Sequence, residues 1–322
     1  MGAQMNRRQF LATSAMAAAG AAGILGGRLE AAPKFRTTLK RALIVGEPTR
    51  ENLQAIKDAG FDGVEAGIVT PEKAAEARKI AEEMGLRIHS VIRGWAQFNS
   101  DNQQEVESGL QVTIDALKAA QAYGADAVLL VPGRMDVNPM PEPWEFRVKF
   151  DRKTGHITQV VEGDNARYQA YIDAHNRAYD AFQVAVRRLI PVARETRVVI
   201  ALENVWNNLF VDPAHFAFFV NSFKNRWVKA YLDLGNHVKY APTEQWVAAL
   251  GKSIAKCHVK DFKLNPDGRG GNFCEIRDGS VDWPVVRKAL DRVGYSDWMT
   301  IEGGSLPFDE QRRRLDLIIA GQ

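Results

Sequence analysis

The sequence contains few cysteines and histidines for its length. Among 322 residues there are 2 cysteines and 6 histidines. Two cysteines cannot build the disulfide framework of a small secreted domain, and they are too few for a cysteine-rich structural zinc site. Cys257 lies within an apolar stretch, where a small buried thiol is the simplest interpretation.

The sequence also lacks any block of lysine and arginine. The formal net charge is +3, and contents of 46% hydrophobic and 25% charged residues are those of an ordinary soluble globular protein. A nucleic-acid partner is therefore not indicated. The apolar stretch near the N-terminus is short and weakly hydrophobic, so no membrane span is predicted.

The first thirty residues differ from the rest of the chain. Asn6-Arg-Arg-Gln-Phe-Leu11 is followed by alanine- and glycine-rich sequence from Ala12 to Gly27. Paired arginines before a mildly apolar segment match a twin-arginine export signal. We therefore predict a signal peptide and linker at residues 1–32, with cleavage near Ala31-Ala32, and a periplasmic or otherwise exported protein. A disordered alanine-rich tail is the alternative.

Strand-like and helix-like segments alternate from residue 33 to residue 322. Several of the helix-like stretches end at a glycine, such as Gly60 or Gly124, which suits a helix stop. Eight such units in one series predict a single α/β domain, a (β/α)8 TIM barrel. A doubly wound sheet is the alternative, but eight units exceed its usual count and only a closed barrel has no edges. The predicted strands are 41–45, 63–66, 86–92, 127–131, 198–202, 228–232, 254–259 and 298–301. The predicted helices are 50–59, 71–85, 103–123, 168–195, one starting at 213, 243–250, 283–293 and 308–319.

Two insertions interrupt this alternation, one after strand 4 and one after strand 7. Residues 132–165 are rich in proline and aromatic residues, and 146–150 and 156–161 alternate like a small hairpin. Because long loops inside a compact domain are usually functional, we expect this insertion to fold over the site. The second insertion, 261–280, is rich in glycine and charge.

Four of the later strands carry a metal-binding side chain at or near their C-terminal ends. These side chains are Glu203, Asp233, His258 and Glu302. The C-terminal ends of the strands in a parallel barrel converge on one face, and active sites lie there. Each carboxylate taken alone could equally be a structural partner of a lysine or arginine. The four together predict a metal site.

Three carboxylates and one imidazole form an oxygen-rich ligand set. It suits one divalent ion, Mn²⁺, Mg²⁺ or Co²⁺, and Zn²⁺ is compatible with it. A sugar with neighbouring carbonyl and hydroxyl oxygens could chelate such an ion, which would stabilise the enediolate formed when the adjacent C–H is deprotonated. Glu203 and Glu302 could then exchange protons as general base and acid from opposite sides of the sugar.

At this point the sequence resembles the xylose isomerase-like TIM-barrel superfamily. Within it the resemblance is to the sugar phosphate isomerase/epimerase family, which contains ketose 3-epimerases, hydroxypyruvate isomerase and inosose dehydratase. It extends over about residues 39–319. The motifs that carry it are Gly60-Phe-Asp-Gly-Val-Glu65, His89, Glu203-Asn204, Asp233-Leu-Gly-Asn236 and His258-Val-Lys-Asp261. The resemblance implies the same metal ligands and the same acid/base pair. It departs from ketose 3-epimerases at Asn236, where they have a histidine, and at Lys260 and Lys263, where they have an arginine.

Six further residues are candidates for binding the substrate. Lys260 could hold substrate oxygens or form a surface ion pair. His89, expected at the end of strand 3, could face the mouth of the barrel or be a core histidine. Trp95 and Trp206, expected in loops, could stack on a sugar ring or serve only in packing. The remaining candidates are Asn236 and its neighbour His237.

The sequence therefore predicts a metal-dependent isomerase or epimerase of a small sugar or keto-sugar. Three alternatives remain open. The same site could act as a lyase or hydrolase that cleaves 3-keto-glycosides, or the barrel could bind sugar without catalysis. A DNA-repair endonuclease with this fold would need about three metal ions and more histidines. A homo-oligomer is neither indicated nor excluded.

Overall fold

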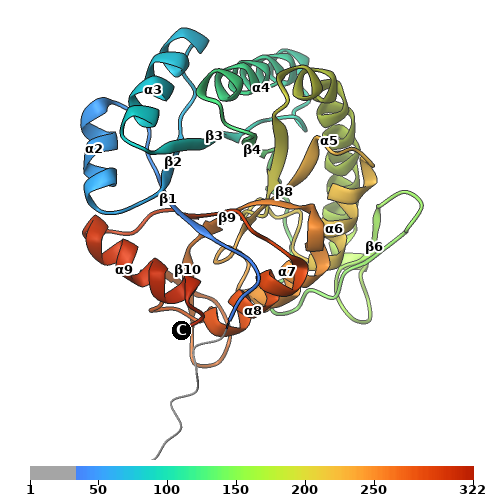
Figure 1. The fold of residues 1–322 in the computed structure, drawn as a ribbon. Helices are drawn as coiled ribbons and strands as arrows, with labels where there is room; N and C mark the ends of the chain where they lie inside the picture. The colour runs from blue at the N-terminus through green and yellow to red at the C-terminus, as the bar shows by residue number, and fades with distance from the viewer. Residues whose placement is uncertain (1–33) are drawn as a thin grey trace, which may run out of the picture. The chain divides into compact units, whose positions relative to one another are not determined.

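The computed structural model describes residues 34–322, which form a closed barrel of parallel strands (Figure 1). Around the barrel the strand order is β1-β12-β9-β8-β7-β4-β3-β2, so strands consecutive along the chain are neighbours and the last pairs with the first. The predicted (β/α)8 barrel is thereby confirmed. The predicted export signal lies outside the described residues. The barrel strands are β1 (Lys40–Ile44), β2 (Gly63–Ala66), β3 (Arg87–Trp95), β4 (Ala127–Val131), β7 (Val199–Glu203), β8 (Val228–Asp233), β9 (Ile254–Val259) and β12 (Trp298–Ile301).

Eight helices form a ring outside the strands (Figure 1). They are α2 (Arg50–Asp58), α3 (Pro71–Glu83), α4 (Gln103–Tyr123), α5 (Gln169–Thr196), α6 (Pro213–Ser222), α7 (Thr243–Leu250), α8 (Trp283–Val293) and α9 (Phe308–Ile319), with 3₁₀ turns at Ala166–Tyr168 and Gly251–Ser253. No helix in residues 34–322 is long and apolar enough to span a membrane.

The helix ends follow local chemistry that is visible in the sequence. At the start of α6, Pro213 occupies the first turn and the Asp212 carboxylate accepts a hydrogen bond from the His215 backbone N–H at 2.8 Å. At the end of α4, Gly124 adopts the left-handed conformation (φ 74°), which glycine tolerates best. Because such signals lie in a few adjacent residues, the predicted bounds of α4, α7, α8 and α9 match the structure.

Two apolar cores alternate along the strands because successive side chains point to opposite faces. Inside the barrel, Ala127, Leu129 and Val131 of β4 pack with Ala201 and Tyr231. The intervening residues of the strands pack outward against the helices in the larger core. The barrel interior is therefore filled by side chains, and the chemistry is confined to its ends.

The insertion after β4 differs from the prediction in where it lies. It forms the expected hairpin, in the shorter strands β5 (Lys149–Phe150) and β6 (Ile157–Gln159). The hairpin docks on the outer helices, where Asn176 of α5 exchanges hydrogen bonds with the backbone of Ile157 and the His215 ring of α6 bonds the Gly155 carbonyl at 2.8 Å. The hairpin therefore lies at the side of the barrel, where two buried histidines and their aromatic neighbours hold it. The expectation that the insertion folds over the site fails for this hairpin, whereas Trp144 of the same insertion lies with its ring centre 5.7 Å from the Arg269 guanidinium of the insertion after β9.

The predicted insertion after β9 contains regular structure. Residues 261–274 form an antiparallel hairpin of β10 (Asp261–Leu264) and β11 (Gly271–Cys274). The buried Asp261 carboxylate holds its base by accepting hydrogen bonds from the backbone N–H groups of Phe262, Arg277 and Val281 and from the Trp283 indole. This hairpin continues directly from β9 and therefore rises from the C-terminal end of the barrel.

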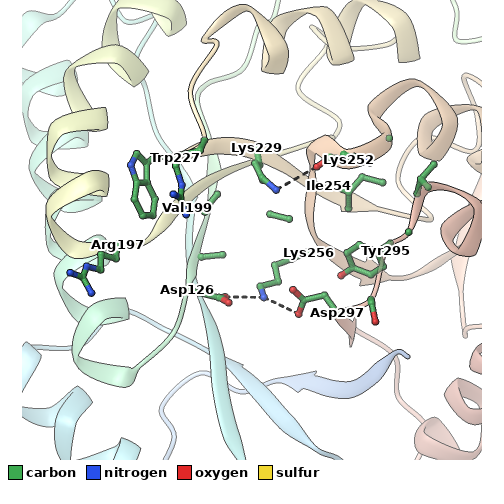
Figure 2. Close-up of a pocket in the computed structure, with 17 residues that line it drawn as sticks. Asp126, Arg197, Val199, Trp227, Lys229, Lys252, Ile254, Lys256, Tyr295 and Asp297 are labelled. Carbon is green, nitrogen blue, oxygen red and sulfur yellow. Dashed lines mark hydrogen bonds and ion pairs between the residues drawn. The ribbon is translucent and has the colours of Figure 1, made fainter. Parts of the chain in front are cut away.

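A cavity of about 660 Å³ lies at the opposite end, where the strands begin (Figure 2). Its floor includes the buried Lys256, whose ammonium lies 2.8 Å from Asp126 and 3.0 Å from Asp297. No residue that lines this cavity belongs to the four predicted metal ligands. Features at the N-terminal face of such barrels generally serve stability, so we assign these ion pairs to closing the barrel floor.

Candidate metal centre

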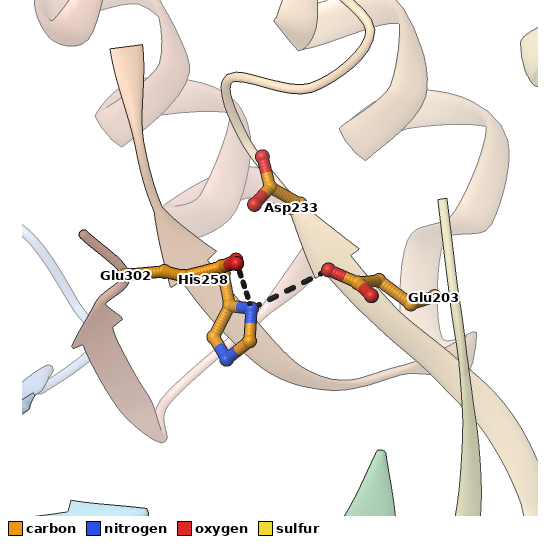
Figure 3. A group of neighbouring side chains, drawn as sticks. All are labelled: Glu203, Asp233, His258 and Glu302. Atoms are coloured by element: carbon orange, nitrogen blue, oxygen red, sulfur yellow. Dashed lines mark ion pairs between the residues drawn. The ribbon is translucent and has the colours of Figure 1, made fainter. Parts of the chain in front are cut away.

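Four neighbouring strands deliver the four predicted ligands to one face of the barrel. Glu203 and Asp233 are the last residues of β7 and β8, His258 is the penultimate residue of β9, and Glu302 directly follows β12. Since these strands are adjacent in the order β12-β9-β8-β7, the side chains converge. One ligand atom from each residue lies within 4.8 Å of the others (Figure 3).

Distances within the group centre on the Nδ1 atom of His258. This nitrogen lies 2.9 Å from Glu302 Oε2 and 3.5 Å from Glu203 Oε1. Figure 3 shows the Asp233 carboxylate beside them, at the end of its strand. Glu203, Asp233 and His258 are buried, and the Glu302 side chain is 31% exposed. The group is thus closed on the barrel side and open toward Glu302.

Three of the four ligand atoms, His258 Nδ1, Asp233 Oδ2 and Glu302 Oε2, are buried and make no hydrogen bond of normal geometry. Their polar neighbours include one another and the Lys260 ammonium. Buried polar atoms in folded proteins are nearly always paired, so three unpaired ones at a single point need an explanation. A cation bound between them would satisfy all three at once.

The other oxygen of Asp233 is fixed by the backbone that follows it. Asp233 Oδ1 accepts hydrogen bonds from the N–H groups of Gly235 at 2.8 Å and Asn236 at 2.6 Å. The Asn204 side chain bridges to the Asp233 backbone, with its amide donating to the carbonyl and its oxygen accepting from the N–H. These contacts hold the carboxylate so that Oδ2 points into the group. The sequence motif contained Asn204 but did not reveal this role.

Glu65 of β2 orients the imidazole of His258. Its Oε2 lies 2.5 Å from His258 Nε2, and its Oε1 accepts a hydrogen bond from the Ser90 hydroxyl at 2.8 Å. Because an ionised carboxylate only accepts, Nε2 carries the proton and Nδ1 is directed at the other carboxylates. Such a carboxylate–histidine pair is the usual partner of a metal-binding imidazole. Glu65 is fully buried.

Lys260 lies over the open side of the group. Its ammonium is 3.0 Å from Glu302 Oε1, 3.9 Å from Asp233 Oδ2 and 3.4 Å from the side-chain oxygen of Asn236. Burial would lower the pKa of Lys260, but the Asp233 and Glu302 carboxylates raise it. The lysine is therefore a cation that touches the carboxylates from the direction in which a substrate would enter.

The carboxylates repel one another strongly in this buried setting. Two unit charges 4.8 Å apart interact by roughly 3 kcal/mol at an effective dielectric of about 20. Burial raises the pKa of Asp233 to about 7 and also raises the pKa of Glu203, with Glu302 adding to both shifts. Burial would likewise raise the pKa of Glu302, but His258 and Lys260 lower it. A divalent cation bound between the carboxylates would offset this repulsion.

Among the predicted substrate-binding residues, Asn236 and Lys260 border the group and Trp206 lies one layer further out. The Trp206 indole donates to the Asn236 carbonyl, and its ring centre is 4.8 Å from that of Phe273. Trp206 therefore borders the mouth of the barrel, as expected for a residue after β7.

His237 and His89 lie elsewhere. His237 is buried against Trp246 and Tyr240, with ring centres 4.7 and 5.2 Å away. The prediction that His89 ends its strand is wrong, since β3 continues to Trp95. His89 stacks on Trp298, the first residue of β12, and its Nε2 lies 3.0 Å from Thr300 Oγ1. It lies within the barrel, which favours the alternative of a core histidine.

Trp95 was expected in a loop but is the last residue of β3, paired with Val131. Its side chain is 43% exposed. The sequence pattern did not predict that β3 extends to Trp95. A register shift between Ile92 and Gly94 interrupts the alternation of side chains between the two faces of the strand. In the described part of the chain, no recorded side-chain contact links Trp95 to the four carboxylate and imidazole ligands.

Comparison with known proteins identifies the relatives of this chain. The family model described as "Xylose isomerase-like TIM barrel" matches residues 53–317. L-ribulose-5-phosphate 3-epimerase UlaE from Escherichia coli is 24% identical over 273 residues, which cover 82% of this chain and 84% of the relative. The residues matched by the family model include every barrel strand except β1 and all four ligands.

Solved structures show the same fold. The 3-keto-D-glucoside 4-epimerase YcjR from E. coli superposes with a TM-score of 0.65 at 15% identity, over 87% of this chain and 99% of that one. A xylose isomerase domain protein from Planctomyces limnophilus gives a TM-score of 0.62 at 13% identity, over 89% and 97% of the two chains. At these identities the likeness establishes the fold alone.

Proposed function

The chain belongs to the xylose isomerase-like TIM barrel family, and from this premise we propose that it is a divalent-metal-dependent sugar isomerase or epimerase. The proposed substrate is a small sugar or keto-sugar, and the proposed reaction begins with removal of a proton from the carbon next to a carbonyl. Glu203, Asp233, His258 and Glu302 are the proposed metal ligands.

The convergence of three unpaired, buried ligand atoms carries this proposal. Three carboxylates with one imidazole fit Mn²⁺, Mg²⁺ or Co²⁺, and Zn²⁺ is also compatible with them. When bound, the metal would supply a Lewis acid that polarises the substrate carbonyl and makes the neighbouring C–H more acidic. The four ligands leave the side toward Lys260 for substrate oxygens.

The protein's own residues would then move the proton. Glu203 and Glu302 approach from β7 and from the end of β12, three strands apart in the barrel order, so their carboxylates flank the space between them. One would remove the proton from one face of the substrate carbon, and the other would return a proton to the opposite face, which inverts that carbon. Return of the proton to the neighbouring carbon would give an isomer instead.

Lys260 supports the charge that develops during this step. Its ammonium already contacts Glu302 Oε1 and lies near Asp233 Oδ2. A substrate oxygen placed beside it would accept a hydrogen bond as negative charge moves onto that oxygen. Such charge-assisted bonds, aimed at where charge develops, are a large part of electrostatic catalysis.

The relatives support a sugar substrate for this site. The matched curated relatives are ribulose-phosphate epimerases, and the structural neighbours include a ketoglucoside epimerase. Cleavage of a 3-keto-glycoside would begin with the same proton removal and differ only in expelling the group at the adjacent carbon. A barrel that merely binds sugar would perform neither step.

Proton exchange in heavy water tests this proposal directly. The chelator-stripped full chain, reloaded with Mn²⁺, Co²⁺, Mg²⁺ or Zn²⁺, would be incubated with 2-ketoses and with 3-keto-glucosides and followed by NMR. We expect one deuterium at the carbon next to the carbonyl, loss of this exchange in Glu203→Gln and Glu302→Gln, and full exchange in the exposed control Glu51→Gln.

The same experiment separates the alternatives. Release of the aglycone from a 3-keto-glucoside would assign the lyase or hydrolase reaction. About one equivalent of bound metal without any exchange, across all substrates, would support the sugar-binding barrel. Absence of bound metal in the native protein, and no thermal stabilisation on adding it, would refute the proposal.

We also propose that residues 1–32 direct export by the twin-arginine route, on the strength of the Arg7-Arg8 pair and the alanine-rich stretch after it. Replacing both arginines with lysine should retain the protein in the cytoplasm. Fractionation of cells that produce the native and substituted chains measures this, and periplasmic delivery of both would contradict it.

A further inference from the structure

A large aromatic side chain is exposed beside the metal centre. Phe273, on β11 of the hairpin that follows β9, is 45% exposed, although nearly all phenylalanines of the described chain are largely buried. Exposing a phenylalanine ring forgoes roughly 1 kcal/mol or more of burial energy. An exposed aromatic residue at the mouth of a barrel therefore suggests a binding role.

The ring is held firmly from below. Phe273 pairs across the hairpin with the buried Phe262, and their ring centres are 5.3 Å apart at an angle of 78°. Trp206 contacts both rings, at 5.5 Å from Phe262 and 4.8 Å from Phe273. The buried Asp261 carboxylate fixes the base of the hairpin through four hydrogen bonds. Because these contacts already restrict the Phe273 side chain, binding of a ligand to its ring would cost little further side-chain entropy.

The Phe273 ring lies close to the proposed metal centre, because Lys260 is near both. Its ammonium lies 5.1 Å from the centre of the Phe273 ring and 3.0 Å from Glu302 Oε1. The ring centre is therefore no more than about 8 Å from that carboxylate, the sum of those two distances. A single sugar ring spans such a gap, so one molecule could reach both the metal centre and Phe273.

Trp206, one of the two aromatic residues expected to stack on sugar, is partly buried and already in contact with several side chains. The ammonium of Lys239 lies 3.4 Å from the centre of the Trp206 ring, and Phe262 and Phe273 contact the same indole. Trp206 thus serves as a support, and the exposed area belongs to Phe273.

We propose that Phe273 is the platform on which the pyranose ring of the substrate stacks. A pyranose presents a patch of C–H bonds on one face and hydroxyl groups at its rim, so it can cover the apolar ring while its oxygens reach Lys260 and the metal ligands. This rests on the proposed function and narrows it to substrates held in ring form, such as glycosides, over open-chain sugars.

Binding measurements on the metal-loaded full chain test this idea without requiring turnover. The probes are methyl glucopyranoside, which is a ring, and sorbitol, its open-chain counterpart, titrated at millimolar concentration by calorimetry. In Phe273→Leu we expect about 3- to 10-fold weaker binding of the glucoside and unchanged binding of sorbitol, as befits loss of one aromatic contact. Phe273→Trp should retain the affinity of the native protein.

Two controls protect the result from a folding artefact. Phe308→Leu changes another exposed phenylalanine, 40% exposed at the start of α9, and should bind the glucoside normally. Metal content and the thermal unfolding midpoint should match in all variants. Equal loss of both probes, no loss of either, or no glucoside binding by the native protein would overturn the stacking role. Absence of deuterium exchange would refute the proposed reaction. The binding measurements would still decide whether Phe273 stacks on the sugar ring, because they do not require turnover.

Discussion

Replacement of Glu65 with glutamine should weaken metal binding although Glu65 is not itself a proposed ligand. The native carboxylate accepts the Nε2 proton of His258 at 2.5 Å and is fully buried. Glutamine keeps the volume and can still accept from Nε2 through its amide oxygen, but it removes the negative charge. His258 then becomes a poorer electron donor at Nδ1, and the imidazole is held less firmly.

The size of the effect can be bounded from the contacts. Loss of a carboxylate partner behind a metal-binding histidine typically costs 10- to 100-fold in affinity, or about 1.4 to 3 kcal/mol. Ser90 currently donates to Glu65 Oε1 at 2.8 Å, and it would face either the amide nitrogen or the amide oxygen of the glutamine. Because the hydroxyl can donate or accept, Ser90 adapts to both orientations, and the loss should fall mainly on His258.

Calorimetric titration of the chelator-stripped protein with Mn²⁺ and Co²⁺ measures this change. Ser90→Ala is the matched control, since it removes the other partner of Glu65 and leaves the His258 bond in place. We expect the control to stay within about threefold of the native affinity and Glu65→Gln to fall by tenfold or more. Equal affinities in Glu65→Gln and the native protein would refute the claim that this carboxylate tunes His258.

Three other perturbations follow from the contacts. Lys260→Met removes an ammonium 3.0 Å from Glu302, so metal affinity measured by titration should rise several-fold while the rate of proton exchange falls at least tenfold. Gly155→Ala should lower the thermal unfolding midpoint, because the added Cβ would lie 2.1 Å from the Tyr179 hydroxyl and φ is +84°. The control Gly163→Ala changes an exposed glycine with a similar φ of +86° but open space around it, so it should lower the midpoint less. Burial lowers the pKa of His175 to about 3 and of His215 to about 4. As the pH falls below about 6.5, the unfolded chain therefore binds more protons than the folded one. The stability contributed by the two neutral histidines is present at neutral pH and should be lost as the pH falls from about 6.5 toward 4. At pH 4.5 the free energy of unfolding should be lower by roughly 2 kcal/mol or more for each histidine. His215→Gln, compared by thermal unfolding at pH 7 and pH 5, should lose less than the native protein, and parallel losses would contradict this assignment.

The regular part of the barrel could be predicted from local patterns. Strands β2, β4, β9 and β12 have the predicted bounds because each is a short apolar run between clear turn signals. The four ligands could be predicted for the same reason, since each stands at or beside the last residue of such a run. Parallel strands that close into a barrel bring those ends together without further information.

What could not be predicted depends on contacts distant in sequence. The position of the β5–β6 hairpin is set by His215, some sixty residues later in the chain, through its bond to the Gly155 carbonyl. The β10–β11 hairpin is fixed by Asp261 through partners up to Trp283. Glu65 meets His258 across 193 residues, and only the closure of the barrel reveals that pair. The proposed role of Phe273 likewise requires knowing which side chains already contact Trp206.

The two carboxylates proposed to move the proton are not equivalent, and the structure supplies the reason. Glu302 is partly open and contacts both the His258 imidazole and the Lys260 ammonium, which lower its pKa, whereas Glu203 is 6% exposed and burial raises its pKa. A carboxylate with the raised pKa holds a proton more readily, and one with the lowered pKa is more readily ionised. Of the two glutamates, Lys260 forms an ion pair with Glu302 and not with Glu203, so this asymmetry depends on the residue that follows β9 as well as on the ligands. A substrate that displaces the ammonium from Glu302 would remove part of that difference, which links its binding to the balance of protons between the two residues.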